Sequence, residues 1–190
     1  MYDLAHYNLV NIAFHQKDYV QAQNWFRKYI SLEKGENKTA LADAYNRIGD
    51  CYLDVRNFDE AKHYYSQAEA MNTPSGDYSF YQLALVSGLQ KDYSGKITWL
   101  NRLAGKYPAS PYAISALYEK GRSYVLMDNN QQAITSFKEL LAKYPESPVS
   151  RKAAAEIGLL YYQNEDYNQA IDAYKQVVQK YPGSDEARLA

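Results

Sequence analysis

The side chains that could do chemistry in this sequence are few, namely three histidines and one cysteine. His6 and His15 are nine residues apart, and on a helix that spacing does not place them on one face at metal-ligand distance. His63 stands far from both. Cys51 follows Asp50 with no histidine nearby, which favours a half-buried small apolar residue over a nucleophile. We therefore predict no catalytic residue, no metal and no cofactor, and a protein that is not an enzyme.

Composition and motifs exclude further classes. The chain has no glycine-rich phosphate loop, no zinc-type Cys or His pair and no nucleophile elbow. Its net charge of −1 gives no bulk attraction to nucleic acid. The sequence has no apolar run of 18 residues, so we predict no transmembrane helix. The start of the chain lacks the basic and apolar regions of a signal peptide. These absences favour binding to another protein over chemistry.

The elements that position these residues are set by an internal repeat. The dipeptide Tyr-Pro occurs at 107–108, 144–145 and 181–182, which is a step of 37 residues. The same step separates four further pairs, which are Gly121 and Gly158, Tyr124 and Tyr161, Ala133 and Ala170, and Phe137 and Tyr174. A fixed period between about 20 and 50 residues indicates a solenoid of stacked units.

Each copy predicts two helices. In the first copy a helical pattern covers 111–127, residues 128–130 break it, and a second pattern covers 131–143. The following Tyr-Pro ends that helix, because the residue before proline is disfavoured in the α region. A unit is therefore a first helix (helix A), a tight turn, a second helix (helix B) and a short link.

Small residues mark where the two helices of a unit cross. A mid-helix glycine costs about 1 kcal/mol against alanine, so it indicates close packing. An alanine on helix B faces it, and an aromatic residue one turn later fills the space beside the crossing. We assign repeat packing to Gly49, Ala61, Tyr65, Gly121, Ala133, Phe137, Gly158, Ala170 and Tyr174.

This pattern resembles the tetratricopeptide repeat (TPR): a small residue, tyrosine three later, alanine twelve later, an aromatic sixteen later and proline twenty-four later. The Tyr-Pro-x-Ser links resemble those of bacterial envelope TPR proteins, such as the outer-membrane assembly lipoprotein and the Tol-Pal-associated periplasmic protein. The resemblance implies an all-α, right-handed superhelical solenoid of antiparallel helix pairs, with about five repeats plus the start of a sixth. It also implies a periplasmic or outer-membrane-associated location in a Gram-negative bacterium.

We expect one array over 1–190, with units at about 3–38, 39–76, 77–110, 111–147 and 148–184. Residues 185–190 predict the start of a further helix. Neither end shows the polar capping helix with which such arrays end. We therefore expect a segment of a longer protein, whose signal sequence lies outside it.

In the family, helices A line a concave groove, and the resemblance implies which positions face it. The expected groove residues are Tyr7, Asn11, Asp43, Asn46, Asp50, Asp54, Tyr78, Tyr81, Tyr118, Arg122, Lys152 and Tyr162. Aromatic side chains mixed with a few polar groups suit a peptide or a partner domain, because rigid rings give contact area at low entropy cost.

Two other interpretations stay open at this point. Tyr78, Tyr81 and Tyr118 could stack on sugar rings, which would make the chain a glycan-binding module. The segment could also be a spacer, or associate with a second copy through its uncapped ends.

Overall fold

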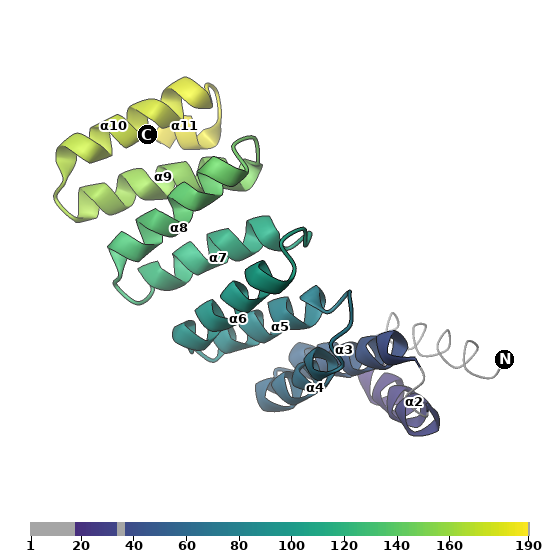
Figure 1. The fold of residues 1–190 in the computed structure, drawn as a ribbon. Helices are drawn as coiled ribbons and strands as arrows, with labels where there is room; N and C mark the ends of the chain where they lie inside the picture. The colour runs from purple at the N-terminus through teal and green to yellow at the C-terminus, as the bar shows by residue number, and fades with distance from the viewer. Residues whose placement is uncertain (1–17, 34–36, 190) are drawn as a thin grey trace. The chain divides into compact units, whose positions relative to one another are not determined.

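The computed structural model describes residues 18–33 and 37–189, and these residues form helices joined by short turns, with no strand. The helices are α2 Tyr19–Leu32, α3 Lys38–Asp54, α4 Phe58–Ala70, α5 Asp77–Leu89, α6 Tyr93–Lys106, α7 Ala113–Val125, α8 Asn130–Lys143, α9 Pro148–Gln163, α10 Tyr167–Lys180 and α11 Asp185–Leu189. Figure 1 shows that the helices from α2 to α5, and those from α7 to α10, run back and forth, each beside the one before it in the chain. The predicted all-α fold of antiparallel helix pairs is confirmed.

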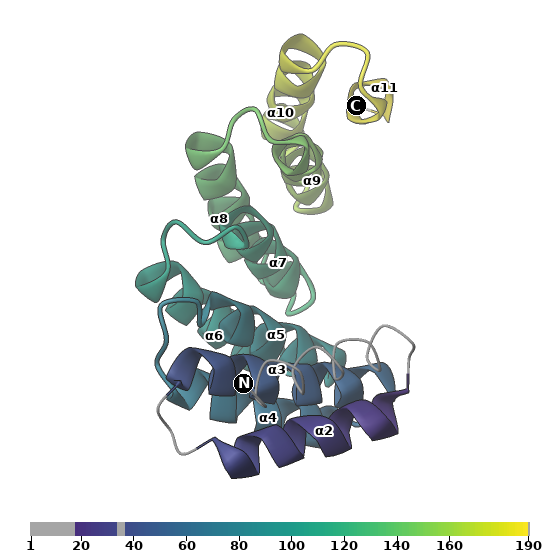
Figure 2. The same cartoon turned by 90° about the vertical axis from the view of Figure 1, so that its right-hand side faces the viewer.

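The chain divides into two compact units, 1–102 and 103–190, and the boundary falls within α6. In the first unit α3 packs against α2, α4 and α5, and Figure 2 shows α2, α3 and α4 side by side. In the second unit α9 packs against α8 and α10, while α7 packs against α8. In the helix pairs α3–α4, α5–α6, α7–α8 and α9–α10, the first member is helix A and the second is helix B.

The turns between helices A and B share a backbone conformation and a helix cap. The residue seven positions after the small crossing residue has a positive φ in four turns, at Arg56, Lys91, Asp128 and Glu165. The next residue is Asn or Asp, and its side chain accepts a hydrogen bond from a backbone N–H of the following helix, at Asn57, Asp92, Asn129 and Asp166. An Asn or Asp at this position satisfies an amide that the first helical turn leaves unpaired. These caps fix where each helix B begins.

The crossing of helices A and B is tight in both units. A Cβ atom added at Gly49 would lie 2.6 Å from Cε1 of Tyr65, and one added at Gly158 would lie 2.6 Å from Cε1 of Tyr174. The facing alanines, Ala61 and Ala170, are buried. Glycine is needed here because the aromatic ring occupies the space that a side chain would take.

Each unit has its own apolar core. In the first, clusters form around Phe26 and Ile48 and around Tyr65 and Leu83. In the second, Ala133 and Phe137 of α8 pack with the inner face of α9 in one cluster. Stacked helix pairs thus bury a layer between each helix A and its two neighbouring helices B, as repeat proteins do.

Candidate functional site

The exposed side of helices α7 and α9, which we call the A-helix face of the second unit, carries a cavity of about 320 Å³. Tyr118 of α7 and Lys152 and Leu159 of α9 line it, and Tyr174 of α10 and Leu189 of α11 complete its wall. Leu159 is 43% exposed although it is apolar. Exposed apolar groups beside tyrosine rings are typical of a surface that binds a partner.

An ion pair borders this cavity. Arg122 of α7 reaches Glu156 of α9, with 3.1 Å between guanidinium nitrogen and carboxylate oxygen. Glu156 also lines the cavity. Burial raises the pKa of Tyr118, and the charge of Glu156 and a hydrogen bond to its side chain raise it further. The cavity therefore offers rings, an apolar floor and the ammonium of Lys152.

The remaining predicted residue of this unit, Tyr162, lies at the end of α9. Its side chain is exposed, and its ring packs edge-on against Tyr167 with centroids 5.7 Å apart. It does not line the cavity.

In the first unit two of the predicted groove residues, Asp50 and Tyr78, belong to a hydrogen-bonded network. The Asp50 carboxylate accepts hydrogen bonds from the hydroxyls of Tyr65 at 2.7 Å and Tyr78 at 2.6 Å. Arg47 donates to the other oxygen at 3.2 Å. Burial raises the pKa of Asp50, and the hydrogen bonds from the two tyrosines oppose that rise. The network ties α3, α4 and α5 together.

The other polar residues of α3 differ in exposure. Asp43 lies 3.5 Å from Arg47. Asn46 is buried, and its side-chain oxygen accepts a hydrogen bond from the Ser79 hydroxyl at 3.0 Å. Asp54 is exposed at the end of α3, and a hydrogen bond to its side chain raises the pKa of Tyr19.

The three tyrosines of the predicted aromatic patch belong to different units. Tyr78 and Tyr81 lie in the first unit and are partly buried, and the ring of Tyr78 packs edge-on against Tyr65. Tyr118 lies in the second unit, where its ring packs against Phe137 with centroids 5.7 Å apart. A shared patch of the three remains a prediction.

Four residues singled out from the sequence, Tyr7, Asn11, His6 and His15, lie outside the described residues. Within 18–33 and 37–189, no group of three histidine, cysteine or acidic side chains could hold a metal ion. Burial raises the pKa of Cys51 to about 12, so this thiol is protonated at neutral pH and is a poor nucleophile. Over the same ranges, no helix combines the length and apolar character needed to cross a bilayer.

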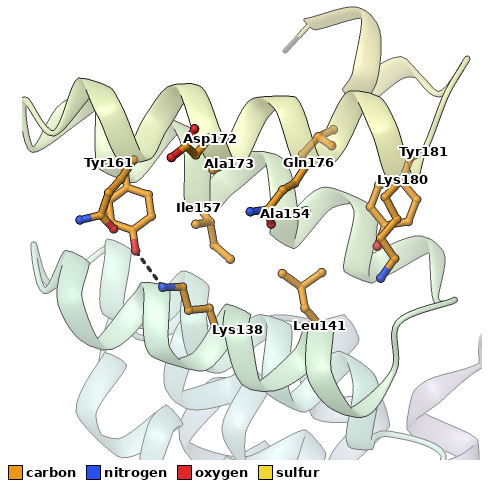
Figure 3. Close-up of a pocket in the computed structure, with 12 residues that line it drawn as sticks. Lys138, Leu141, Ala154, Ile157, Tyr161, Asp172, Ala173, Gln176, Lys180 and Tyr181 are labelled. Atoms are coloured by element: carbon orange, nitrogen blue, oxygen red, sulfur yellow. Dashed lines mark hydrogen bonds between the residues drawn. The ribbon is translucent and has the colours of Figure 1, made fainter.

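A second cavity, of about 330 Å³, was not anticipated from the sequence (Figure 3). It opens between the two helices B of the second unit, α8 and α10, and α9 forms its floor. Leu141, Ala154 and Ile157 line it deep inside, whereas Lys138 and Tyr161 meet at its edge, with 2.8 Å from the ammonium to the phenol oxygen. We call it the B-helix slot of the second unit.

Comparison with family models gives two matches. One model, described as tetratricopeptide repeat, matches residues 46–111 and 118–185, and a second model of the same description matches residues 2–73. Together they extend over most of the chain. No curated protein matches it.

Solved structures with the same fold are distant in sequence. A crystal structure of MamA protein is 17% identical and has a TM-score of 0.76, over 99% of this chain and 96% of that one. YrrB, described as a TPR protein with an unusual peptide-binding site, is 18% identical with a TM-score of 0.69, over 97% of this chain and 89% of that one. BtubC (BKLC) from P. vanneervenii is 12% identical with a TM-score of 0.73, over 90% and 76%. At these identities the likeness shows the fold alone.

Proposed function

The chain belongs to the tetratricopeptide repeat family, and on this premise we propose that it is a non-enzymatic scaffold that binds a peptide segment or a partner domain. The observation that carries the proposal is the cavity on the A-helix face of the second unit. Its volume of about 320 Å³ lies at the small end for ligand sites, which fits one or two side chains of a polypeptide. The fold likeness to YrrB, a TPR protein with an unusual peptide-binding site, supports the same class of ligand.

The contacts of the cavity define what would fit. An apolar side chain would pack between Tyr118 and Tyr174 onto Leu159, and it would displace water from all three. Lys152 is exposed at the edge and suits a carboxylate of the partner. The ion pair of Arg122 and Glu156 links α7 to α9 beside the cavity.

Sugar stacking by the tyrosines has less support. The hydroxyl of Tyr78 donates a hydrogen bond to Asp50, and its ring packs edge-on against Tyr65. Stacking on a sugar needs an open ring face, and the exposed rings of the second unit, Tyr162 and Tyr167, pack against each other.

A bacterial cell-envelope complex is the setting we propose, on the Tyr-Pro-x-Ser links at 107–110 and 144–147. Fractionation of cells of the source organism, followed by immunoblotting, tests that location.

Site-specific photo-crosslinking in those cells tests the scaffold. A photoreactive phenylalanine analogue replaces Leu159 in the cavity, and Gln131, exposed on α8, is the matched control position. We expect one partner to crosslink at 159 and not at 131, and Lys152→Glu with Tyr118→Ala to abolish the product. Equal capture at both positions, or a product that survives the double substitution, would overturn the A-helix face as the binding surface.

A further inference from the structure

Within the described residues, three slots lie inside a single unit, each between consecutive helices B and floored by the helix A that separates them. The pairs are α2 and α4 over α3, α4 and α6 over α5, and α8 and α10 over α9. Two repeat positions point into the slot. One lies four residues before the small crossing residue of helix A, and the other lies three after the crossing position of helix B.

The first slot is closed by tyrosines. Tyr45 and Tyr64 occupy the two positions, with ring centroids 6.4 Å apart. Tyr64 also stacks on Tyr52, at 5.5 Å with an interplanar angle of 17°. From α2, Arg27 donates from Nε to the Tyr64 hydroxyl at 3.3 Å, and it also donates to the hydroxyl of Tyr52. The aromatic rings thus fill this space, and the guanidinium of Arg27 is hydrogen-bonded to them at its edge.

The second slot is closed in the same way. Phe80 and Trp99 occupy the two positions, with centroids 5.8 Å apart in an edge-on arrangement. Arg102 lies over the Trp99 ring at 4.4 Å and forms an ion pair with Glu69 at 2.8 Å. Both slots of the first unit are therefore plugged by a pair of rings from the chain itself.

The third slot lacks its rings. Ala154 precedes Gly158 by four residues, as Tyr45 precedes Gly49, and Ala173 follows Ala170 by three, as Tyr64 follows Ala61. These two alanines leave the cavity of about 330 Å³ (Figure 3). The surroundings are otherwise kept: Tyr161 stands where Tyr52 stands, and Lys138 stands where Arg27 stands.

We propose that the B-helix slot of the second unit binds a tyrosine side chain of a partner polypeptide, which inserts between α8 and α10. The ring would stack on Tyr161 as Tyr64 stacks on Tyr52, over the apolar floor of Leu141 and Ile157. An ammonium has three N–H donors, so Lys138 can bond the Tyr161 hydroxyl and the incoming phenol together. The first unit therefore shows, within the same chain, the geometry in which the ligand would sit.

The edge of the slot adds a preference for charge. Lys138 and Lys180 line it against a single acidic residue, Asp172. An acidic residue beside the tyrosine of the partner would meet this excess of positive charge, which favours association and orientation. The slot lies among helices B, so this proposal holds whatever the A-helix face of the second unit binds.

The test uses blocked peptides and NMR of the alanine methyl groups of the full chain. The probe is acetyl-Glu-Tyr-Glu-amide, and the matched peptide has leucine in place of tyrosine. We expect saturable shifts of the Ala154 and Ala173 methyl signals with a dissociation constant on the order of millimolar, as suits a single inserted side chain. The leucine peptide is expected to bind at least about fivefold more weakly, because it offers neither a ring for stacking nor a hydroxyl.

Ala173→Tyr restores the ring of the first unit and should abolish the shifts at Ala154, while Ala173→Ser should keep them. Circular dichroism confirms that each variant is folded, and Ala154→Phe replaces Ala173→Tyr if the latter is not. Equal binding of the two peptides, no shift at 20 millimolar peptide, or binding that survives in a folded plugged variant would each overturn the proposal. Crosslinking at Leu159 would be unaffected by Ala173→Tyr, so failure here is distinct from failure of the scaffold on the A-helix face.

Discussion

In the first unit, aromatic rings of the chain itself fill the slots between consecutive helices B. In the second unit, the corresponding slot between α8 and α10 is open. The crossing glycines Gly49 and Gly158 correspond, and the slots differ in ring content at two positions: Tyr45 against Ala154, and Tyr64 against Ala173. Large side chains there build a core, and small ones build a cavity. In a repeat protein the change from structural layer to binding surface therefore needs no change of fold, only of side-chain volume at repeat positions.

The largest effect is expected where a plug is removed. Phe80→Ala should lower the free energy of unfolding of the first unit by about 3–5 kcal/mol, because the 1% exposed ring leaves a void beside Trp99. Urea unfolding followed by tryptophan fluorescence measures it, since both tryptophans lie in this unit. Leu89→Ala, at an exposed position of the same helix, is the control and should stay within about 0.5 kcal/mol. A loss below 1 kcal/mol for Phe80→Ala would mean that the rings do not carry the core.

The next effect separates the two crossings. Gly49→Ala places a methyl 2.6 Å from Tyr65, which is fully buried and held by Asp50, so the ring cannot move aside. We expect a loss of about 1–3 kcal/mol, in spite of the better helix propensity of alanine. Gly158→Ala meets Tyr174, which is partly exposed and can swing outward, and should change stability by less than about 0.5 kcal/mol. Equal losses in urea unfolding would mean that the ring of Tyr174 is held as firmly as the ring of Tyr65.

Much of the fold was open to prediction because it rests on local spacing. Gly158 with Ala170, and the 37-residue step, define the helix pair without any knowledge of neighbours. The same holds for the turns, where Asn129 caps α8. Such features depend on residues within one unit, where sequence distance and spatial distance run together.

The candidate sites were less accessible. Asp50 and Tyr78 were both expected in the groove, but their hydrogen bond joins residues 28 positions apart on different helices. Exposure could not be read from helix register alone, as the burial of Asn46 shows. The B-helix slot did have a signal, the paired alanines Ala154 and Ala173 in columns that hold Tyr45 and Tyr64, and Phe80 and Trp99, in the first unit. Only the structure shows that the two columns, one on helix A and one on helix B, meet in the same slot.

A smaller effect compares the cations at the two slots. Arg27→Ala should cost about 1 kcal/mol, because it removes hydrogen bonds to Tyr52 and Tyr64 and a guanidinium about 6 Å from both rings. Lys138→Ala should cost about 0.5 kcal/mol or less, since its slot is open to solvent and one phenol is its partner. Thermal unfolding of the two variants side by side measures the difference. A larger loss for Lys138→Ala would reverse the comparison.

The smallest effect is a dependence on pH that only the first unit should show. Burial raises the pKa of Asp50 above its unfolded value of about 3.9, so the folded state binds a proton that the unfolded state has already released. The stability that this group contributes is complete below the unfolded pKa and is lost as pH rises through the folded pKa. Arg47, Tyr65 and Tyr78 face the carboxylate and limit the rise.

Asp50→Asn removes the titration but keeps an oxygen that can accept from both phenols. The unfolding free energy of the wild type minus that of Asp50→Asn should therefore fall as pH rises above about 4, the unfolded pKa, measured by urea unfolding at several pH values. Asp54→Asn changes an exposed aspartate one turn later and provides the control. It should keep the pH dependence of the unfolding free energy that Asp50 gives to the wild type. A difference that rises with pH would mean that the hydrogen bonds of Tyr65 and Tyr78 outweigh burial, and that the network acts as a lock for the charged carboxylate. In either case the slope isolates a polar tie between α3, α4 and α5.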